Sequence, residues 1–356
     1  MSAVMQLVPE KSTLNIHLEL IGHWLLDASI TEIVINEPGR VRVEHQGGRW
    51  ETHDVPAATF AWCMDLAHLT QNYTSQAISE ETPLLGAQLP GGERVQIVVP
   101  PAVRAGTVSI TIRRPSTLVM TLDELAAGGT FAQTIGVQSL LLASDERVHL
   151  ESLLGARDKA LLSLFRAGDW RGFFDASVQY RKNIVSSGAT GAGKTTLSVA
   201  LAALIGEDER IITIEDVWEM RLTGHHVSMV YPRNGNGVAK VTARLLLEAA
   251  LRMRPDRILL AELRGDEAFF FMQNVLNSGH PGTITSIHAT SSKLAFHRLA
   301  LMIKGSVEGG GIDLADILKS LYALVDVVAQ MERLDDGRRV VSEAYFDPAF
   351  ALKQQG

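Results

Sequence analysis

The chain has 356 residues, 46% hydrophobic and 21% charged, which is long enough for about two domains with cores of their own. Its formal net charge of -7 argues against a protein that coats nucleic acid over its whole surface. The single cysteine, Cys63, excludes a disulfide framework or a cysteine-rich zinc site within one chain and fits a reducing compartment. The first residues lack the basic start and apolar block of a secretory signal, and no apolar run reaches the roughly 20 residues that span a bilayer. We therefore expect a cytoplasmic protein.

The N-terminal third predicts a small α+β domain, which we place at residues 1–130. Helical spacing of apolar residues predicts helices at 18–26 and 59–71. Alternating patterns between Gly- and Pro-containing turns predict strands at 32–36, 41–45, 49–53, 84–89, 94–99 and 107–113. The pair Gly47-Gly48 indicates that the second and third of these strands form a hairpin.

Residues 131–182 predict a linker with connecting helices. Helices are expected at 122–127, after the cap-like Thr121, and at 157–166 and 170–181, whereas 130–150 has no clear pattern.

Residues 183–356 predict an α/β domain. Short apolar strands alternate with helical segments such as 242–253, and the segment 312–330 is expected to be helical and then extended. The strands are expected at 184–185, 210–214, 227–230, 257–261 and 282–287. This order predicts a mostly parallel sheet with ligand chemistry at the C-terminal ends of its strands.

The most informative motif is GATGAGKT, which follows the apolar pair Ile184-Val185. A spacing of G-x-x-x-x-G-K-T between a strand and a helix is that of a phosphate-binding loop. Glycines let several backbone N–H groups turn toward one anion, and the following helix adds the positive end of its dipole. The lysine supplies a point charge for the β- and γ-phosphates, and the threonine supplies a hydroxyl for Mg²⁺. The sequence predicts ATP and Mg²⁺ as cofactors, with Thr195 on the metal. The nucleotide-binding residues are expected to be Gly188, Ala189, Thr190, Gly191, Ala192, Gly193, Lys194, Thr195 and Thr196.

Hydrolysis at such a loop needs acidic groups for Mg²⁺ and for the attacking water. One set, Glu215, Asp216 and Glu219, follows the strand expected at 210–214. We expect Glu215 to assist Mg²⁺, directly or through water, whereas a solvated acidic turn is the alternative.

A second acid, Glu262, follows the strand expected at 257–261. Ala261 precedes it, so no aspartate is available there for the metal. Glu262 is the candidate for activating water, and the alternative is an ion pair with Arg264 or Arg257.

A histidine and two arginines are further candidates. His288 follows the strand expected at 282–287 and is placed to sense a γ-phosphate or position water, with a structural role as the alternative. Arg94 and Arg113 lie on strands of the N-terminal domain. A forked, permanently charged guanidinium suits a phosphate clamp, and surface solvation is the alternative.

Four segments, in one order along the chain, resemble motifs of the secretion ATPases, in particular the traffic ATPases of type IV secretion and plasmid conjugation systems. They are the phosphate loop, TIEDVWE at 213–219, LRMRPDRILLAELRG at 251–265 and SGHPGTITSIHA at 278–289, which look like the Walker A, Asp box, Walker B and His box. GERVQIVVPP at 92–101 and TVSITIRRPS at 107–116 extend the resemblance into the N-terminal domain. The two CxxC pairs of a zinc module, present in some type II relatives, are absent, which disfavours the type II branch.

The resemblance implies a RecA-like ATPase domain with nucleotide bound between it and the N-terminal domain, and a homo-hexameric ring. It implies that Glu262 is the catalytic acid, that Glu215 and Glu219 assist, that His288 reports the γ-phosphate, and that Arg94 and Arg113 face phosphate. The ATPase would power pilus biogenesis and substrate translocation at the cytoplasmic face of the inner membrane. Its partners would be inner-membrane secretion components, through which it associates peripherally with the membrane, and a coupling ATPase.

Three alternatives stay open on the sequence. One is a type IV pilus or type II secretion motor from the same superfamily. Another is a nucleic-acid translocase on a RecA-like core. The acidic composition and the lack of a basic and aromatic strip speak against it, so no direct nucleic-acid binding is expected. The third is a scaffold that binds nucleotide without hydrolysis, against which Glu262 argues.

Overall fold

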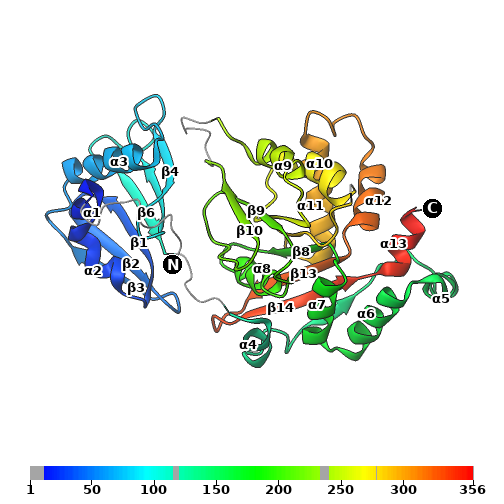
Figure 1. Ribbon diagram of the computed structural model, residues 1–356. Helices are drawn as coiled ribbons and strands as arrows, with labels where there is room; N and C mark the ends of the chain where they lie inside the picture. Colours follow the sequence, from blue (N-terminus) through cyan, green and yellow to red (C-terminus); the bar gives the residue numbers. More distant parts are fainter. Residues whose placement is uncertain (1–11, 115–119, 233–239, 278, 356) are drawn as a thin grey trace. The chain divides into compact units, whose positions relative to one another are not determined.

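The computed structural model describes residues 12–114, 120–232, 240–277 and 279–355. The chain forms two compact units, the first made mostly of residues before 115 and the second mostly of residues after 119. Each unit is built on a sheet of its own (Figure 1).

Unit 1 contains a six-stranded antiparallel sheet with the order β3-β2-β1-β6-β5-β4. Its strands are β1 (Ile30–Glu37), β2 (Arg40–His45), β3 (Trp50–Asp54), β4 (Leu84–Gln88), β5 (Arg94–Val98) and β6 (Ser109–Arg113). Its helices are α1 (Thr13–Leu18), η2 (Glu19–Ile21), α2 (Gly22–Leu26) and α3 (Phe60–Thr74). Alternate strand residues, such as Val95 and Ile97, pack with Leu14 of α1 and Leu66 of α3 in one core. The strands expected for this region are present, with small shifts at their ends, whereas the helix expected at 18–26 begins at Thr13 and is divided into α1, η2 and α2.

Unit 2 contains an eight-stranded sheet with the order β10-β9-β11-β12-β8-β13-β14-β7. Its strands are β7 (Ile135–Val137), β8 (Ile184–Gly188), β9 (Ile211–Glu215), β10 (His226–Val230), β11 (Arg257–Leu260), β12 (Ile284–Ile287), β13 (Val327–Arg333) and β14 (Arg339–Phe346). Across the sheet, the neighbouring strands β9, β11, β12, β8 and β13 pair in parallel, and β14 pairs antiparallel with β13. Every residue of β8, β9, β11 and β12 is buried, as expected for central strands covered on both faces.

Helices of unit 2 lie on both sides of this sheet, with α6 and α7 on one side and α11 and α12 on the other (Figure 1). The helices are α4 (Leu122–Ala127), α5 (Ser144–Leu153), α6 (Ala156–Ala167), α7 (Trp170–Gln179), α8 (Lys194–Ala202), α9 (Ala243–Leu251), α10 (Glu267–Phe271), the π-helix η3 (Met272–Leu276), α11 (Ser292–Gly305), α12 (Leu314–Leu324) and α13 (Pro348–Gln355). This arrangement confirms the expected fold class, a mostly parallel α/β sheet accompanied by a separate, smaller α+β part.

Several elements of unit 2 were not anticipated. Residues 130–150, which had no clear pattern, contribute β7 and α5, and β7 pairs in parallel with β14. The segment 131–182, expected to connect two domains, lies in unit 2. Strand β14 and helices α10, α11 and α13 were also missed. Short elements such as β7 acquire their pairing from residues far away in the chain, which a local pattern does not report.

An aromatic cluster joins α6 and α7 to β14 in unit 2. The fully buried ring of Phe173 lies 5.6 Å from Phe165, 5.3 Å from Phe174 and 5.4 Å from Phe346, measured between centroids. We expect Phe173→Ala to lower the free energy of unfolding by about 3–5 kcal/mol, because it removes apolar burial and leaves a cavity. Urea titration followed by circular dichroism measures the change. The exposed Leu141 provides the control, since Leu141→Ala should change stability by less than about 0.5 kcal/mol. An equal effect of both substitutions would contradict this view of the core.

Candidate active site

The turn between β8 and α8 has a backbone that only glycine adopts easily. Gly188, Gly191 and Gly193 have φ angles of +150°, +77° and +98°. A Cβ on Gly188 would also collide with the backbone carbonyl of Met331 on β13. The glycines of the motif are therefore required by the loop conformation, which lets consecutive N–H groups face one side.

Lys194 starts helix α8 and is 8% exposed. Its Nζ donates to the carbonyl oxygens of Gly188 at 2.8 Å and Ala189 at 3.0 Å, and lies 3.3 Å from Nδ1 of His288. The ammonium group is thus held at the mouth of the loop. The positive end of the α8 dipole lies at the same place, so the loop favours an anion.

The strand order brings two more of the expected residues to this lysine. Strand β12 lies between β8 and β11, so His288 after β12 and Glu262 after β11 leave the sheet at the same edge as the loop. Nε2 of His288 is 3.0 Å from Oε1 of Glu262. The other Glu262 oxygen, Oε2, accepts from Arg264 at 2.6 Å. Lys194, His288, Glu262 and Arg264 form one continuous chain of polar contacts, which we call the catalytic chain.

Charges within the catalytic chain set its protonation. Burial opposes ionisation of Glu262, but the hydrogen bond and charge of Arg264, with smaller contributions from His288 and Lys194, outweigh it and hold the Glu262 pKa below its usual range. Burial and the Lys194 charge lower the pKa of His288, so its imidazole is neutral at neutral pH. Its Nδ1 faces an ammonium donor and must accept, which leaves the proton on Nε2 to be donated to Glu262.

Hydrogen bonds from side chains tie the strand ends that carry His288 and Glu262 to neighbouring segments. Ser286 Oγ donates to the Ala261 carbonyl at 2.7 Å. Gln330 on β13 reaches across β8 and donates to the Ala289 carbonyl at 3.2 Å, directly after His288. Glu343 on β14 accepts from the N–H and hydroxyl of Ser292 at 2.8 and 2.6 Å. The loop that carries His288 is therefore tied to β13 and β14.

Glu215 occupies a different place from the catalytic chain. Strand β9 is three strand spacings from β8, or about 14 Å across the sheet. The Glu215 carboxylate is fully buried, and its Oε1 accepts from the N–H groups of Glu219 at 3.0 Å and Met220 at 2.8 Å. Ser228 Oγ lies 3.4 Å from Oε2. In the described part of the chain, the hydrogen bonds of Glu215 close its own turn and do not reach Lys194 or Glu262.

The burial of Glu215 predicts a pH-dependent stability. Desolvation raises its pKa from the ordinary 4.5 to about 7, against the hydrogen bonds from Met220 and Glu219. Below pH 4.5 both folded and unfolded chains are protonated here, and as pH rises toward 7 only the unfolded chain ionises freely. This contribution to the free energy of unfolding, about 3 kcal/mol, is therefore lost as pH rises through the folded pKa. Urea titrations between about pH 4 and pH 8 should show this decline in the wild type and a flatter profile in Glu215→Gln. Parallel profiles would show that Glu215 titrates normally.

Arg94 and Arg113 stand directly opposite each other in unit 1. They are Cα partners in the antiparallel pair of β5 and β6. Both lie on the sheet face opposite to the buried Val95 and Ile112. This register brings two positive charges to one face of the sheet, and Arg94 forms an ion pair with Asp216, whose Oδ1 lies 3.4 Å from Nη2. Glu32 on β1, the partner of Arg113 on its other side, has its pKa raised by burial in spite of that guanidinium.

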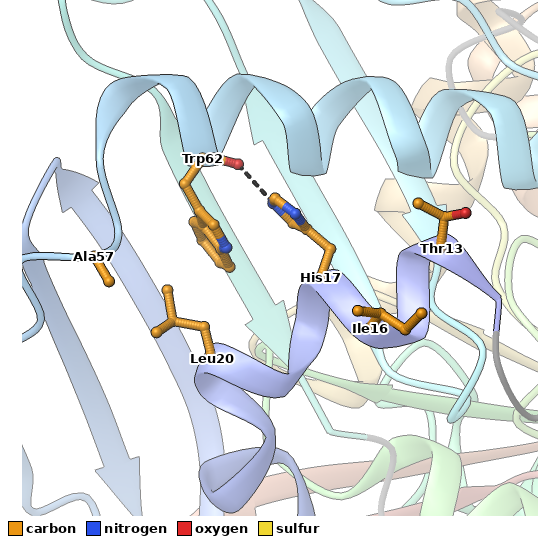
Figure 2. A pocket seen from close by; sticks show the side chains of 6 residues that line it. All are labelled: Thr13, Ile16, His17, Leu20, Ala57 and Trp62. Carbon is orange, nitrogen blue, oxygen red and sulfur yellow. Dashed lines mark hydrogen bonds between the residues drawn. The ribbon is translucent and has the colours of Figure 1, made fainter.

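A hollow of about 370 Å³ in unit 1 is a separate feature (Figure 2). It is lined by Thr13, Ile16, His17, Leu20, Ala57 and Trp62. His17 and Trp62 stack with their ring centroids 4.8 Å apart, and Nε2 of His17 is 2.9 Å from the Trp62 carbonyl oxygen. Its lining carries no guanidinium or ammonium group, so it does not suit a phosphate.

The structure thus brings Lys194, His288 and Glu262 together beside the loop 188–196, whereas Glu215 lies in the turn after β9. The pairing left open for Glu262 is with Arg264, because Arg257 is bound to Glu209. Gln330 and the loop contact of Arg339 were not anticipated as parts of a site. Both residues come from segments without a motif, and the order of the strands brings them to the loop.

None of the helices in the described residues combines the length and the apolar character that crossing a membrane requires.

Comparisons with known proteins agree with these motifs. Residues 169–335 match the family described as type II/IV secretion system protein. The type IV secretion system protein VirB11 of Bartonella henselae is 45% identical over 332 residues, covering 93% of this chain and 92% of the relative. VirB11 of Brucella suis is 42% identical over 347 residues, covering 96% and 92%, and PtlH of Bordetella pertussis is 40% identical over 344 residues, covering 95% and 96%.

Solved structures are similar over the same length. The crystal structure of the VirB11 ATPase from the Brucella suis type IV secretion system, in complex with sulphate, has 42% identity and a TM-score of 0.53, covering 96% of this chain and 97% of that one. The pilus retraction motor PilT with bound ADP has a TM-score of 0.58 at 16% identity, covering 97% and 87%, which supports the fold alone. The expected kinship is confirmed: the chain belongs to the VirB11 family of type IV secretion ATPases.

Proposed function

We propose that this secretion-system ATPase hydrolyses ATP with Mg²⁺ at the loop 188–196, and that the catalytic chain performs the reaction. The observation that carries the proposal is the contact of Lys194 with His288 and of His288 with Glu262. Together they place a phosphate-binding cation, a neutral imidazole and an ionised carboxylate at one edge of the sheet. The loop amides and Lys194 would hold the phosphates, and Glu262 would accept a proton from the attacking water.

The residues present fit Mg²⁺ in the manner usual for nucleotide sites. Thr195 follows Lys194 in the first turn of α8 and is exposed, so its hydroxyl is available to a cation at the loop. Within the described residues, no group of three or more His, Cys, Asp or Glu side chains forms a dedicated metal cage. Mg²⁺ commonly relies on substrate phosphates and water with few protein ligands, and it would supply charge neutralisation between the phosphates. Glu215 and Glu219 are retained as proposed assistants, acting through water.

The direct test is phosphate release by the purified protein with ATP and Mg²⁺, compared with the same reaction in EDTA. Hydrolysis that depends on Mg²⁺ supports the proposal, and release that is insensitive to EDTA contradicts it. Stimulation by single-stranded DNA in a salt-sensitive manner would instead favour the nucleic-acid translocase.

The paired arginines of unit 1 are proposed to bind phosphate. Two guanidinium groups on one sheet face favour an anion such as a phosphate, which would compete with the Asp216 carboxylate that Arg94 already contacts. We expect Arg113→Gln to lower kcat/KM for ATP by about ten- to a hundredfold, from the loss of charge-assisted hydrogen bonds. Steady-state kinetics measure this change. Arg114→Gln is the matched control, because Arg114 donates to the carbonyl of Asp27. Equal effects of the two substitutions would contradict the proposal that Arg113 binds phosphate.

The cellular role is proposed from the family. Relatives are named as components of type IV secretion systems, which supports a motor that powers pilus biogenesis and substrate translocation. We propose a homo-hexameric ring that is peripheral at the cytoplasmic face of the inner membrane. It would be held there by secretion-system membrane components, with a coupling ATPase as a further partner. Native mass spectrometry with and without ATP and Mg²⁺ tests the ring, and a monomer under both conditions would exclude it.

A further inference from the structure

A second hollow, of about 260 Å³, lies in unit 2 beside one end of the catalytic chain. Its lining combines the loop that follows Glu262 with residues of α11: Arg264, Gly265, Asp266, Arg298, Leu301, Met302 and Gly305. The four residues of α11 are spaced i, i+3, i+4 and i+7, which places them on one face of the helix. The hollow therefore lies between that loop and one face of α11.

Gly305 leaves this hollow open. A Cβ built on Gly305 would meet no atom within 4 Å, and the φ angle of this residue lies outside the left-handed region. A larger residue can therefore stand here without backbone strain. Leu301 is 57% exposed and Met302 is partly buried, so the lining also offers apolar surface to the stem of a ligand.

Two guanidinium groups and one carboxylate set the charge of the lining. Arg298 is exposed, and among the described residues its guanidinium has no ion-paired or hydrogen-bonded partner. Asp266 supplies the negative charge. The balance favours a ligand with a single negative charge over a doubly charged phosphate. A guanidinium fork also matches the plane of a carboxylate.

Arg264 belongs both to this hollow and to the catalytic chain. Its Nη2 donates to Oε2 of Glu262 at 2.6 Å. Its backbone N–H donates to Oε1 of Glu267 at 2.6 Å, and the same oxygen accepts from the N–H of Gly265 at 3.1 Å. The backbone of the loop is thus held in place, while the long side chain can turn. A carboxylate in the hollow would compete with Glu262 for this guanidinium.

We propose that the hollow binds a carboxylate carried on an apolar stem, through Arg298 and Arg264, and that the bound carboxylate slows hydrolysis by drawing Arg264 away from Glu262. None of the lining residues belongs to the loop 188–196, so this ligand does not take the place of a nucleotide. Only the effect on hydrolysis rests on the proposed function, because it requires Glu262 to act as the base.

The first test is the binding of butyrate to the full chain, measured by saturation-transfer NMR. We expect a Kd of about 1–10 mM for the wild type, as for one charge-assisted contact with a little apolar burial. Gly305→Leu fills the hollow and keeps both arginines, and it should weaken butyrate by at least about tenfold. Gly305→Ala adds only a methyl group and should bind within about threefold of the wild type. Thermal melting shows that the variants are folded.

The charge of the hollow is tested separately. Arg298→Gln should weaken butyrate about tenfold, because it removes one of the two guanidinium groups. Lys293→Gln is the matched control, since Lys293 is an exposed cation of α11 that does not line the hollow. Equal affinities in the wild type, Gly305→Leu and Arg298→Gln would mean that butyrate binds elsewhere, as an adventitious ion only, and would overturn the proposal. So would a wild type that does not bind butyrate.

A blocked glutamate, N-acetylglutamic acid α-methylamide, distinguishes the source of the carboxylate. Binding at least as tight as that of butyrate assigns the hollow to an acidic side chain of a partner protein. Weaker binding assigns it to a free organic acid. Both results support the carboxylate chemistry, provided that Gly305→Leu weakens the tighter ligand.

The second half of the proposal is tested by steady-state hydrolysis of ATP. Saturating butyrate should lower kcat about three- to tenfold with KM unchanged, and Gly305→Leu should lose this inhibition. Binding in the hollow without inhibition would overturn the coupling between Arg264 and Glu262. If the wild type does not hydrolyse ATP at all, the proposed function fails, whereas the binding of butyrate in the hollow is decided by the NMR measurements alone.

Discussion

Replacing Glu262 with glutamine is expected to slow phosphate release by about 10²- to 10⁴-fold while ATP still binds. The carboxylate is the one group of the catalytic chain that can accept a proton, because Lys194 and Arg264 are cationic and the accepting nitrogen of His288 faces Lys194. Its lowered pKa keeps it ionised at neutral pH, in the form that a general base requires. Glutamine has a similar shape and cannot take the proton. Single-turnover hydrolysis and calorimetric ATP binding measure the two quantities separately.

A glutamine at 262 must also present an amide NH₂ group to His288 or Arg264, so the integrity of the site needs a control. Glu267→Gln provides one, because Glu267 is a nearby carboxylate that accepts the backbone N–H groups of Arg264 and Gly265. That variant should keep a near-normal rate. Turnover by Glu262→Gln above about a tenth of the wild-type rate would remove Glu262 from the role of base.

Lys194→Gln is expected to lower turnover by about 10²- to 10³-fold and to weaken ATP binding, because it removes the ammonium group held against the carbonyls of Gly188 and Ala189. The same change should raise the pKa of His288, since the Lys194 charge contributes to its depression. Proton NMR titration of the imidazole follows this shift independently of activity.

The matched control for Lys194 is Lys353→Gln on α13, an exposed lysine that pairs with Glu146 at 2.9 Å. It should leave turnover and the His288 titration unchanged, and thermal melting should show that both variants keep the fold. A Lys194→Gln enzyme with wild-type turnover would contradict the assignment of this loop. An unchanged pKa of His288 would contradict the contact between the two side chains.

Much of the local structure followed from the sequence because its causes are local. The positive φ angles at Gly188, Gly191 and Gly193 need glycine, so the loop could be located without any knowledge of the fold. Thr121 caps the helix 122–127. Its hydroxyl accepts a hydrogen bond from the N–H of Glu124, and the carboxylate of Glu124 accepts one from the N–H of Thr121. The strands of unit 1 could also be predicted, because burying one face of each strand makes apolar and polar residues alternate along it.

Other features followed from contacts between distant segments. The raised pKa of Glu215 depends on complete burial inside its turn, whereas the sequence shows only an acid after a strand. The pairing of Arg94 with Arg113 depends on the register of β5 and β6. Strand β14 has its antiparallel partner within reach along the chain, but its contact with the loop through Arg339 spans 148 residues.

The sequence by itself determined the loop, the types of most elements and the residues able to do phosphate chemistry, because glycine geometry, apolar periodicity and side-chain charge are properties of short segments. Only the tertiary structure decided which of those residues work together. Parallel strands are joined by crossovers, so neighbours in the sheet are not neighbours in the chain, and the position of β12 between β8 and β11 is what joins Lys194 to His288 and His288 to Glu262. The same order leaves Glu215 in its own turn and brings Arg339, which no motif marked, to the other side of the loop.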